Sequence, residues 1–235
     1  PPPYAVGMTR QGKVSRFRIA THHEVSTKNG RKYMSLAKGD EVIAMSVLRH
    51  VKVGVEERDE YLAAVNAARR LKGGDYTKRA EDKARDEELV MKLNEEKFVR
   101  MAEEEEYLLT IAADGLGKRS SAYEYRIAGR GGQGIANIDL ARGKKKTHVA
   151  AALTVLDSDQ IVMGSDSGQI IRCSIDKVSI VGRSSRGVSI FNTADGEQVV
   201  SVSRLRDVNG DDEGGDEAEE VENGGPEAEA APQGN

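Results

Sequence analysis

Apolar and polar residues alternate along the first 49 residues in a way that predicts β-strands. Within residues 14–19 (Val-Ser-Arg-Phe-Arg-Ile), polar and apolar side chains alternate with period two from Arg16 onward, as in a half-buried strand. Residues 4–8 form an earlier short strand, and Gln11 and Gly12 lie in the turn between the two. Residues 41–48 are almost continuously apolar, so we expect a third strand that is buried on both faces.

The apolar period becomes helical between residues 50 and 106. Apolar residues fall near helical spacing from Val55 to Leu71 and again from Leu89 to Met101, with Glu and Lys between them. A Lys-Gly-Gly-Asp sequence at 72–75 separates the two stretches, which predicts two helices. We interpret this part as an inserted helical hairpin or linker, and we favour a solvated spacer over a helix that binds a partner.

The strand pattern returns after residue 106 in two further units. Each unit, 107–156 and 161–205, offers about four strands in roughly 45 residues, which is the size of a propeller blade. The expected strands are 107–111, 135–138 and 149–153 in the first of them, and 161–163, 170–173, 187–191 and 199–202 in the second.

A glycine–arginine pattern recurs in all three β units. Self-similarity of this kind is typical of repeat architectures such as propellers, in which each unit buries its apolar face by packing on its neighbours. The first glycine and the arginine four residues later are Gly12 and Arg16, Gly115 and Arg119, and Gly168 and Arg172; a second glycine follows at Gly30, Gly134 and Gly187.

Charge divides the chain further. The last 29 residues, 207–235, hold 11 acidic residues, no Lys or Arg and few apolar groups, so we expect a disordered tail. The insertion holds 16 acidic and 12 basic residues. Because the whole chain has a net charge of −4, the β units carry a surplus of 11 positive charges, an arrangement common in polyanion binders. We divide the chain into a first blade (1–49), a helical insertion or linker (50–106), two further blades (107–206) and an acidic tail (207–235).

Other features of the sequence limit the cellular environment in which we expect the protein. No apolar run approaches the ~18 residues of a membrane span. The single Cys173 excludes an internal disulfide and suits a reducing cytosol. A start at Pro1, without Met or a signal peptide, is what a piece of a longer polypeptide would show.

Basic residues recur at matching places in the β units. On a propeller such places lie at one rim, where guanidinium and ammonium groups can follow the phosphates of a curved duplex. Neighbouring glycines would let the backbone approach phosphate and offer N–H donors. The alternative is that these residues are ordinary solvated surface charges. The positive surplus of the β units and the matching positions of the basic residues in the repeats argue against it. The predicted contacts with double-stranded DNA are Lys13, Arg16, Arg31, Lys118, Arg119, Arg130, Gly131, Gly132, Gly134, Lys144, Lys145, Lys146, Arg172, Arg183 and Arg186.

No catalytic, metal or cofactor site is predicted. Residues 129–134 (Gly-Arg-Gly-Gly-Gln-Gly) match a dinucleotide fingerprint, but a strand pattern follows them where that site needs a helix. A calcium-loop pattern from Asp207 has Asp212 where glycine is required. The four histidines are too scattered for a zinc site, and no Ser/His/Asp set stands out.

Several segments resemble the C-terminal domain of the DNA gyrase A protein, which belongs to the type IIA topoisomerases. They are EYLLT at 106–110, DGLGKRSSAYEYR at 114–126 and GRGGQGI at 129–135, with GDEVI at 39–43 and, similar to the last blade of that domain, VGRSSRGV at 181–188. The resemblance covers about residues 4–205 and is strongest from 106 onward.

The resemblance implies an all-β fold, a β-pinwheel disc of up to six propeller-like blades that binds, bends and wraps duplex DNA. It implies partners in an A2B2 assembly, namely the remaining gyrase A domains and the gyrase B protein, and a cytoplasmic, nucleoid-associated location. In this family the catalytic tyrosine, the cleavage metal and the ATP site lie outside this domain. We therefore expect no enzymatic activity and no cofactor in this chain alone, with ATP and Mg bound only by the parent enzyme.

Two departures from the family pattern qualify that expectation. Three blades instead of six predict an incomplete disc. The family's wrapping sequence, QRRGGKG in the first blade, has its nearest match in AGRGGQG at 128–134, in a later blade. Two alternatives therefore stay open: the equivalent domain of topoisomerase IV, which unlinks DNA, and a propeller that binds proteins.

Overall fold

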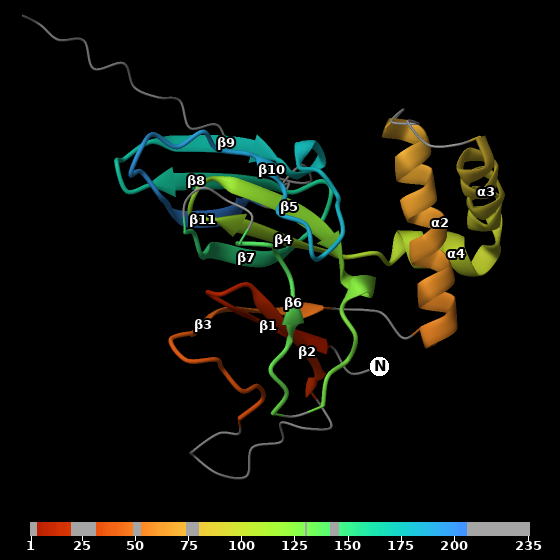
Figure 1. Ribbon diagram of the computed structural model, residues 1–235, viewed down its shortest axis with the longest axis horizontal. Coiled ribbons are helices and arrows are strands. Elements are labelled where there is room, and N and C mark those ends of the chain that lie inside the picture. Colours follow the sequence, from red (N-terminus) through yellow and green to blue (C-terminus); the bar gives the residue numbers. More distant parts are fainter. Residues whose placement is uncertain are drawn as a thin grey trace, which may run out of the picture.

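Three antiparallel sheets stand side by side, with a group of helices along one flank (Figure 1). The computed structural model describes residues 4–19, 32–48, 53–73, 80–129, 131–141 and 146–205. The prediction of an all-β, propeller-like fold with a helical insertion is confirmed for these residues. The four-part division of the chain remains a prediction, and the acidic tail lies outside the described residues.

The first sheet combines two different β units. Its strands β1 (Tyr4–Thr9), β2 (Lys13–Arg18) and β3 (Val42–Leu48) come from the first unit, in the order β3-β1-β2-β6. The outer strand β6 (Ile135–Ala136) comes from the second unit, where Ile135 pairs with Val14. The expected strand at 135–138 is thus shorter than predicted and belongs to its neighbour's sheet.

The second sheet repeats this exchange. Its strands β4 (Tyr107–Ala112), β5 (Leu116–Ser121) and β7 (Val149–Val155) come from the second unit. The outer strand β10 (Val188–Ser189) comes from the third unit and pairs with β5, in the order β10-β5-β4-β7. The second and the third unit therefore each contribute a short strand to the sheet of the preceding unit.

The third sheet has three strands among the described residues. They are β8 (Gln160–Ser165), β9 (Ile170–Ser174) and β11 (Val199–Leu205), in the order β11-β8-β9. No described segment pairs with the outer edge of β9, and Ile170 is 72% exposed there. The corresponding residue of the first sheet, Val14, is 1% exposed under β6.

The core forms two layers on either side of the second sheet. Because side chains alternate along a strand, Leu108 packs with Val6 and Met8 of the first sheet, whereas Leu109 packs with Ile161 and Met163 of the third. All six side chains are essentially inaccessible to solvent. The middle sheet is thus buried on both faces and joins the three units into one body.

The third predicted strand is not buried as expected. In β3, Met45 is 57% and Val47 is 49% exposed, while Leu48 is buried. Leu48 and Ala44 face the core between the first two sheets, and because side chains alternate along a strand, Met45 and Val47 lie on the opposite face of β3. Its continuous apolar character alone could not show this.

The insertion contains three helices and a single 3-10 turn in its described part. Helix α2 (Val55–Gly73) ends at the predicted break, and α3 (Ala80–Met91), η1 (Lys92–Asn94) and α4 (Glu96–Glu103) follow. The sequence predicted only two helices, because the short turn at η1 carries no Gly or Pro. No helix of the described part is both long and apolar enough to cross a membrane.

A small aromatic core fixes the insertion to the second β unit. Tyr61 of α2 packs with Phe98 of α4 and with Tyr123 of the 3-10 turn η2 (Ala122–Glu124), whose ring centre lies 5.2 Å from that of Tyr61. The Tyr123 hydroxyl donates to the Met101 carbonyl at 3.0 Å, and the Tyr61 hydroxyl donates to Glu105 at 2.9 Å. The helices are therefore part of the folded body.

Candidate nucleic-acid interface

The repeating arginines of the first two units are buried between blades. Arg16 is 4% exposed, and its guanidinium donates to the carbonyls of Ala122 and Tyr125 at 3.3 and 3.2 Å. Arg119 is also 4% exposed, and its Nε donates to the Val178 carbonyl at 2.7 Å. The acceptors of both arginines lie in or beside the 3-10 turn of the following unit, η2 for Arg16 and η3 (Ile175–Lys177) for Arg119.

The neighbouring Lys118 is buried in the same way. Its Nζ donates to the carbonyls of Gly182 and Arg183 at 2.8 and 2.6 Å, and burial lowers the pKa of Lys118 to about 7. Burial also lowers the pKa of Arg16. These three cations hold successive units together, because buried carbonyls need donors.

The expectation that Arg16, Lys118 and Arg119 contact DNA phosphates is therefore wrong for this structure. These cations do occupy matching positions in the repeats, but the reason is packing between successive units. The equivalent Arg172 of the third unit is exposed, and its Nε donates to Gln160 at 2.6 Å. It differs because no described unit follows the third sheet.

The glycine-rich loop serves two purposes. A Cβ on Gly134 would lie 2.8 Å from the Val14 carbonyl, so this glycine allows β6 to approach β2. Gly131 and Gly132 are exposed, and no atom lies within 4 Å of a Cβ built on Gly131. The loop is anchored on the first unit, since the Gly131 N–H donates to the Tyr33 carbonyl at 2.9 Å. Gly131 and Gly132 thus remain open to a ligand, whereas Gly134 does not.

Cations from three places in the sequence meet around β6. Lys13 is exposed and stands opposite Ala136 in the sheet, and the Arg183 guanidinium donates to the Ala136 carbonyl at 2.8 Å. Arg126 is exposed and lines a cleft of about 270 Å³ along the glycine-rich loop. We call this surface the β6 patch: Lys13, Arg126, Arg183, Gly131 and Gly132.

Arg126 was missed by the sequence reasoning. It follows Tyr125 in the basic and aromatic stretch before the loop, but it has no counterpart in the arginine register of the repeats. Four of the predicted contacts, Arg31, Arg130, Lys144 and Lys145, lie outside the described residues.

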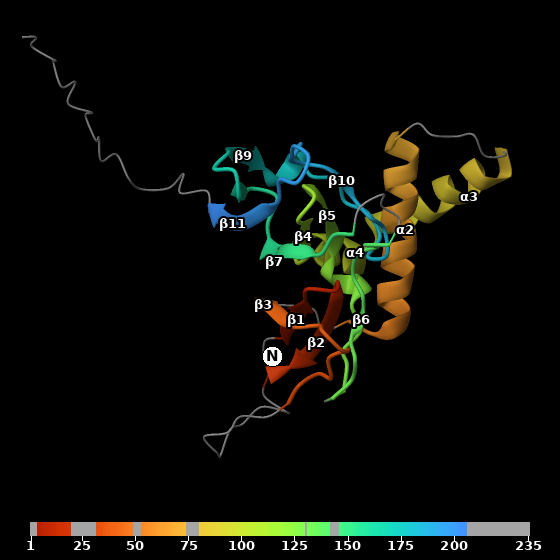
Figure 2. The ribbon, with the colours of Figure 1, turned by 60° about the vertical axis from the view of Figure 1, so that its left-hand side comes forward.

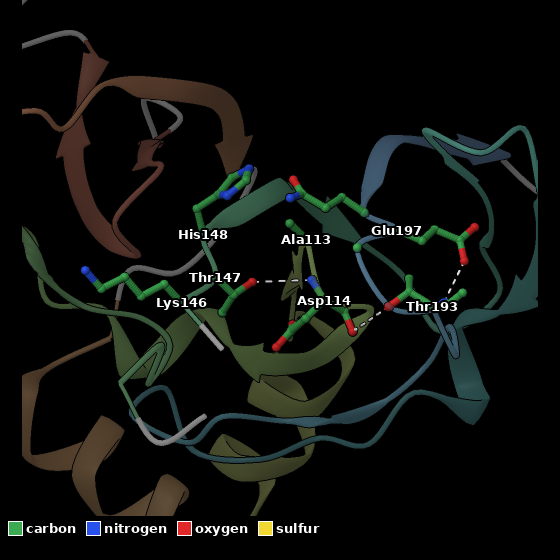
Figure 3. A pocket seen from close by; sticks show the side chains of 10 residues that line it. Ala113, Asp114, Lys146, Thr147, His148, Thr193 and Glu197 are labelled. Atoms are coloured by element: carbon green, nitrogen blue, oxygen red, sulfur yellow. Dashed lines mark hydrogen bonds between the residues drawn. The ribbon is translucent and has the colours of Figure 1, made fainter. Parts of the chain in front are cut away.

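Arg186 and Lys146 lie in a different neighbourhood, around Asp114. Arg186 forms an ion pair with Asp114 at 2.8 Å. Lys146 borders a pocket of about 280 Å³ that also holds Asp114 and Glu197, and Figure 3 shows its side chain pointing away from both carboxylates. His148 in the same pocket has its pKa lowered by burial and by Arg10. Mixed charge makes this pocket a poorer place for phosphate than the β6 patch.

Three sheets that exchange outer strands around a basic surface define a propeller-like module of the pinwheel kind. The family model described as "DNA gyrase C-terminal domain, beta-propeller" matches residues 4–49, 106–143 and 159–206. The chain belongs to this family.

Individual relatives agree with that membership. The DNA gyrase A protein of Granulibacter bethesdensis is 41% identical over 231 residues, which cover 93% of this chain and 24% of the relative. The DNA gyrase A protein of Rickettsia bellii is 39% identical over 217 residues, covering 90% of this chain and 23% of the relative. This chain therefore spans about a quarter of the length of these relatives.

Among solved structures, the fold is similar to a crystal structure of the C-terminal domain of DNA topoisomerase IV. The TM-score is 0.59 at 13% identity, over 87% of this chain and 47% of that chain. A likeness at this level of identity shows the fold alone.

Proposed function

We propose that this chain is the duplex-DNA-binding, bending and wrapping module of a DNA gyrase A protein. Family membership supports the parent enzyme, and the β6 patch supports a phosphate-binding surface. The observation that carries the proposal is the meeting of Lys13, Arg126 and Arg183 beside exposed glycines. Several cations gathered on one surface are what the phosphates of a DNA backbone attract.

In this proposal the rest of the parent enzyme supplies the chemistry. The remaining gyrase A domains and the gyrase B protein, in an A2B2 assembly on the nucleoid, would provide strand cleavage, ATP hydrolysis and Mg. The module itself would contribute bent DNA of one handedness for negative supercoiling. Bending a short duplex costs on the order of 1–6 kcal/mol, which several phosphate contacts must offset.

A salt titration tests DNA binding by the full chain. Affinity for a linear duplex should fall with salt at a log–log slope of about −0.9 per neutralised phosphate. Replacing Lys13, Arg126 and Arg183 together by Ala should make that slope shallower by about 2.7. The matched control replaces three exposed cations of the insertion, Arg85, Lys92 and Arg100. Salt-independent binding of the wild type, or equal losses in both triple variants, would refute the proposal.

The acidic tail enters the proposal as a competitor of DNA. Its 11 carboxylates and lack of cations suit it to occupy the same basic surface. A chain ending at Leu205 should then bind the duplex more tightly at low salt. If both chains bind the duplex with the same affinity, the tail does not compete with DNA and this part of the proposal is wrong.

The equivalent domain of topoisomerase IV is the second candidate. The observation in its favour is the incomplete wrapping sequence at residues 128–134, which lies in the second unit. Reconstituting the parent protein with its partner separates the two, since ATP-driven negative supercoiling supports gyrase and decatenation without supercoiling supports topoisomerase IV.

A further inference from the structure

We propose that the helical insertion is itself part of the DNA-binding surface. Arg58 of α2, together with Arg126 and Arg183 of the β6 patch, forms a cleft that holds one backbone phosphate of the bound duplex. This inference rests on the proposed function and names a contact that the repeats do not supply.

The three arginines converge although they are far apart in the sequence. Arg58 and Leu62 of α2, Arg126, Ile135 of β6 and Arg183 line one cleft of about 470 Å³. Figure 2 shows β6 and its flanking segments running alongside α2. The cleft shares Arg126 and Ile135 with the smaller cleft along the glycine-rich loop. A DNA backbone that crosses the β6 patch would therefore meet Arg58 next.

Arg58 is held in position by its own helix. Tyr61, three residues further on, is 1% exposed in the aromatic core and hydrogen-bonded to Glu105. The Arg58 side chain is 22% exposed, so most of it is covered while part of it still reaches solvent. A side chain that is fixed before binding loses less conformational entropy when it contacts a ligand.

Two carboxylates line the cleft. Asp59 accepts from Arg58 at 3.0 and 2.7 Å. One oxygen of Glu124 accepts from the Arg183 backbone N–H at 2.7 Å, and its other oxygen is buried without a hydrogen-bond partner among the described residues. No hydrogen bond or ion pair to Arg126 is found among the described residues. Three arginines against two carboxylates leave one positive charge, which one phosphodiester would neutralise.

Apart from Asp59, the acidic residues of the first turns of α2 do not line this cleft. Glu57 accepts from the Gly54 N–H at 3.1 Å, and Glu60 pairs with Lys97 at 3.3 Å. The Asp59 carboxylate is 61% exposed, so its ion pair with Arg58 is weak. Arg58 can therefore exchange Asp59 for a phosphate, with which a guanidinium forms a bidentate pair.

The test compares single variants of the full chain on a labelled linear duplex of about 30 base pairs over a salt series. Arg58→Ala should lower the affinity several-fold and make the salt slope shallower by about 0.9, as loss of one phosphate contact does. Arg58→Lys should retain most of the slope, because it keeps the charge. Arg85→Ala is the control: the same residue type, exposed, on α3 of the same insertion.

The outcomes separate this inference from the proposed function. If Arg58→Ala binds with the wild-type slope while Arg126→Ala does not, the insertion lies outside the DNA path and the inference is wrong, although the module still binds DNA. Equal effects of Arg58→Ala and Arg85→Ala would also overturn it, because the effect would then be one of net charge. If the wild type binds without salt dependence, both fail. Thermal melting of each variant shows that the fold is intact.

Discussion

At the scale of the residue, one arginine position has two different roles. Arg16 and Arg119 are closed in by the 3-10 turn of the following unit and donate to carbonyls in or beside it. Arg172, at the same place in the third unit, reaches solvent. The surroundings, and not the residue type, decide whether the guanidinium supports the fold or is available to a ligand.

This difference predicts unequal effects on stability. Arg119→Ala leaves the buried Val178 carbonyl without its donor and should cost about 2–4 kcal/mol of unfolding free energy. Arg172→Ala removes an exposed side chain and should cost less than about 0.5 kcal/mol. Urea unfolding of both variants measures the two values. Similar losses at the two positions would contradict the stabilising role of the buried Arg119 hydrogen bonds.

Lys118 predicts a pH dependence of stability. Its pKa is lowered by burial from 10.5 in a solvated chain to about 7 in the fold, so above pH 7 the unfolded chain holds a proton that the folded one lacks. Its contribution to stability should rise from about pH 7 upward and stay flat below.

The matched variant is Lys118→Met, which fills a similar volume without the charge. The comparison should stop below pH 10, because Tyr61 and Tyr107 have raised pKa values in the fold and destabilise it above that pH. Denaturant midpoints that rise with pH equally in the wild type and in Lys118→Met would show that another group is responsible.

At the scale of the element, strand exchange explains the recurring glycines. Gly115 has a φ of +77°, and a Cβ there would lie 1.9 Å from the carbonyl oxygen of Phe191, in the following unit. Gly168 has the same backbone conformation, with a φ of +86°, but nothing lies within 4 Å of its Cβ position. The first glycine is required by the turn and by its neighbour, the second by the turn alone.

Substitution by alanine at these two turns separates the causes. Gly168→Ala should cost about 1 kcal/mol, the strain of a left-handed residue. Gly115→Ala carries the same strain and also pushes the third unit away, so it should cost at least about twice as much. Thermal unfolding of the two variants gives the comparison. Equal shifts would mean that the units are packed less tightly at Gly115 than described.

The insertion shows the same dependence on tertiary contacts. The helical period of the insertion is visible in the sequence. The period does not show which residues of the insertion pack against the β units. Tyr61, Phe98 and Tyr123 make these contacts across 62 residues of sequence and so place α2 beside β6. The neighbourhood of Arg58 and Arg126 follows from this docking.

At the scale of the whole molecule, the β units form a row in which the last sheet differs from the first two. The first two sheets each receive a strand from the unit that follows, whereas β9 has no such strand among the described residues. Ile170 and Arg172 are exposed there as a direct consequence. The chain spans about a quarter of its gyrase A relatives, so its wrapping of DNA is proposed only as part of the parent enzyme.

The sequence by itself determined the β units, the helical insertion, the positive surplus of the repeats and the family. These follow from period, composition and motif, which are local properties of the chain. Only the tertiary structure decided that each exchanged outer strand belongs to the preceding sheet, that Arg16, Lys118 and Arg119 are buried, and that Arg58 meets Arg126 and Arg183. Burial and proximity depend on contacts between units distant in the sequence, and the repeat pattern is the same for a cation that faces solvent and for one that faces the next blade.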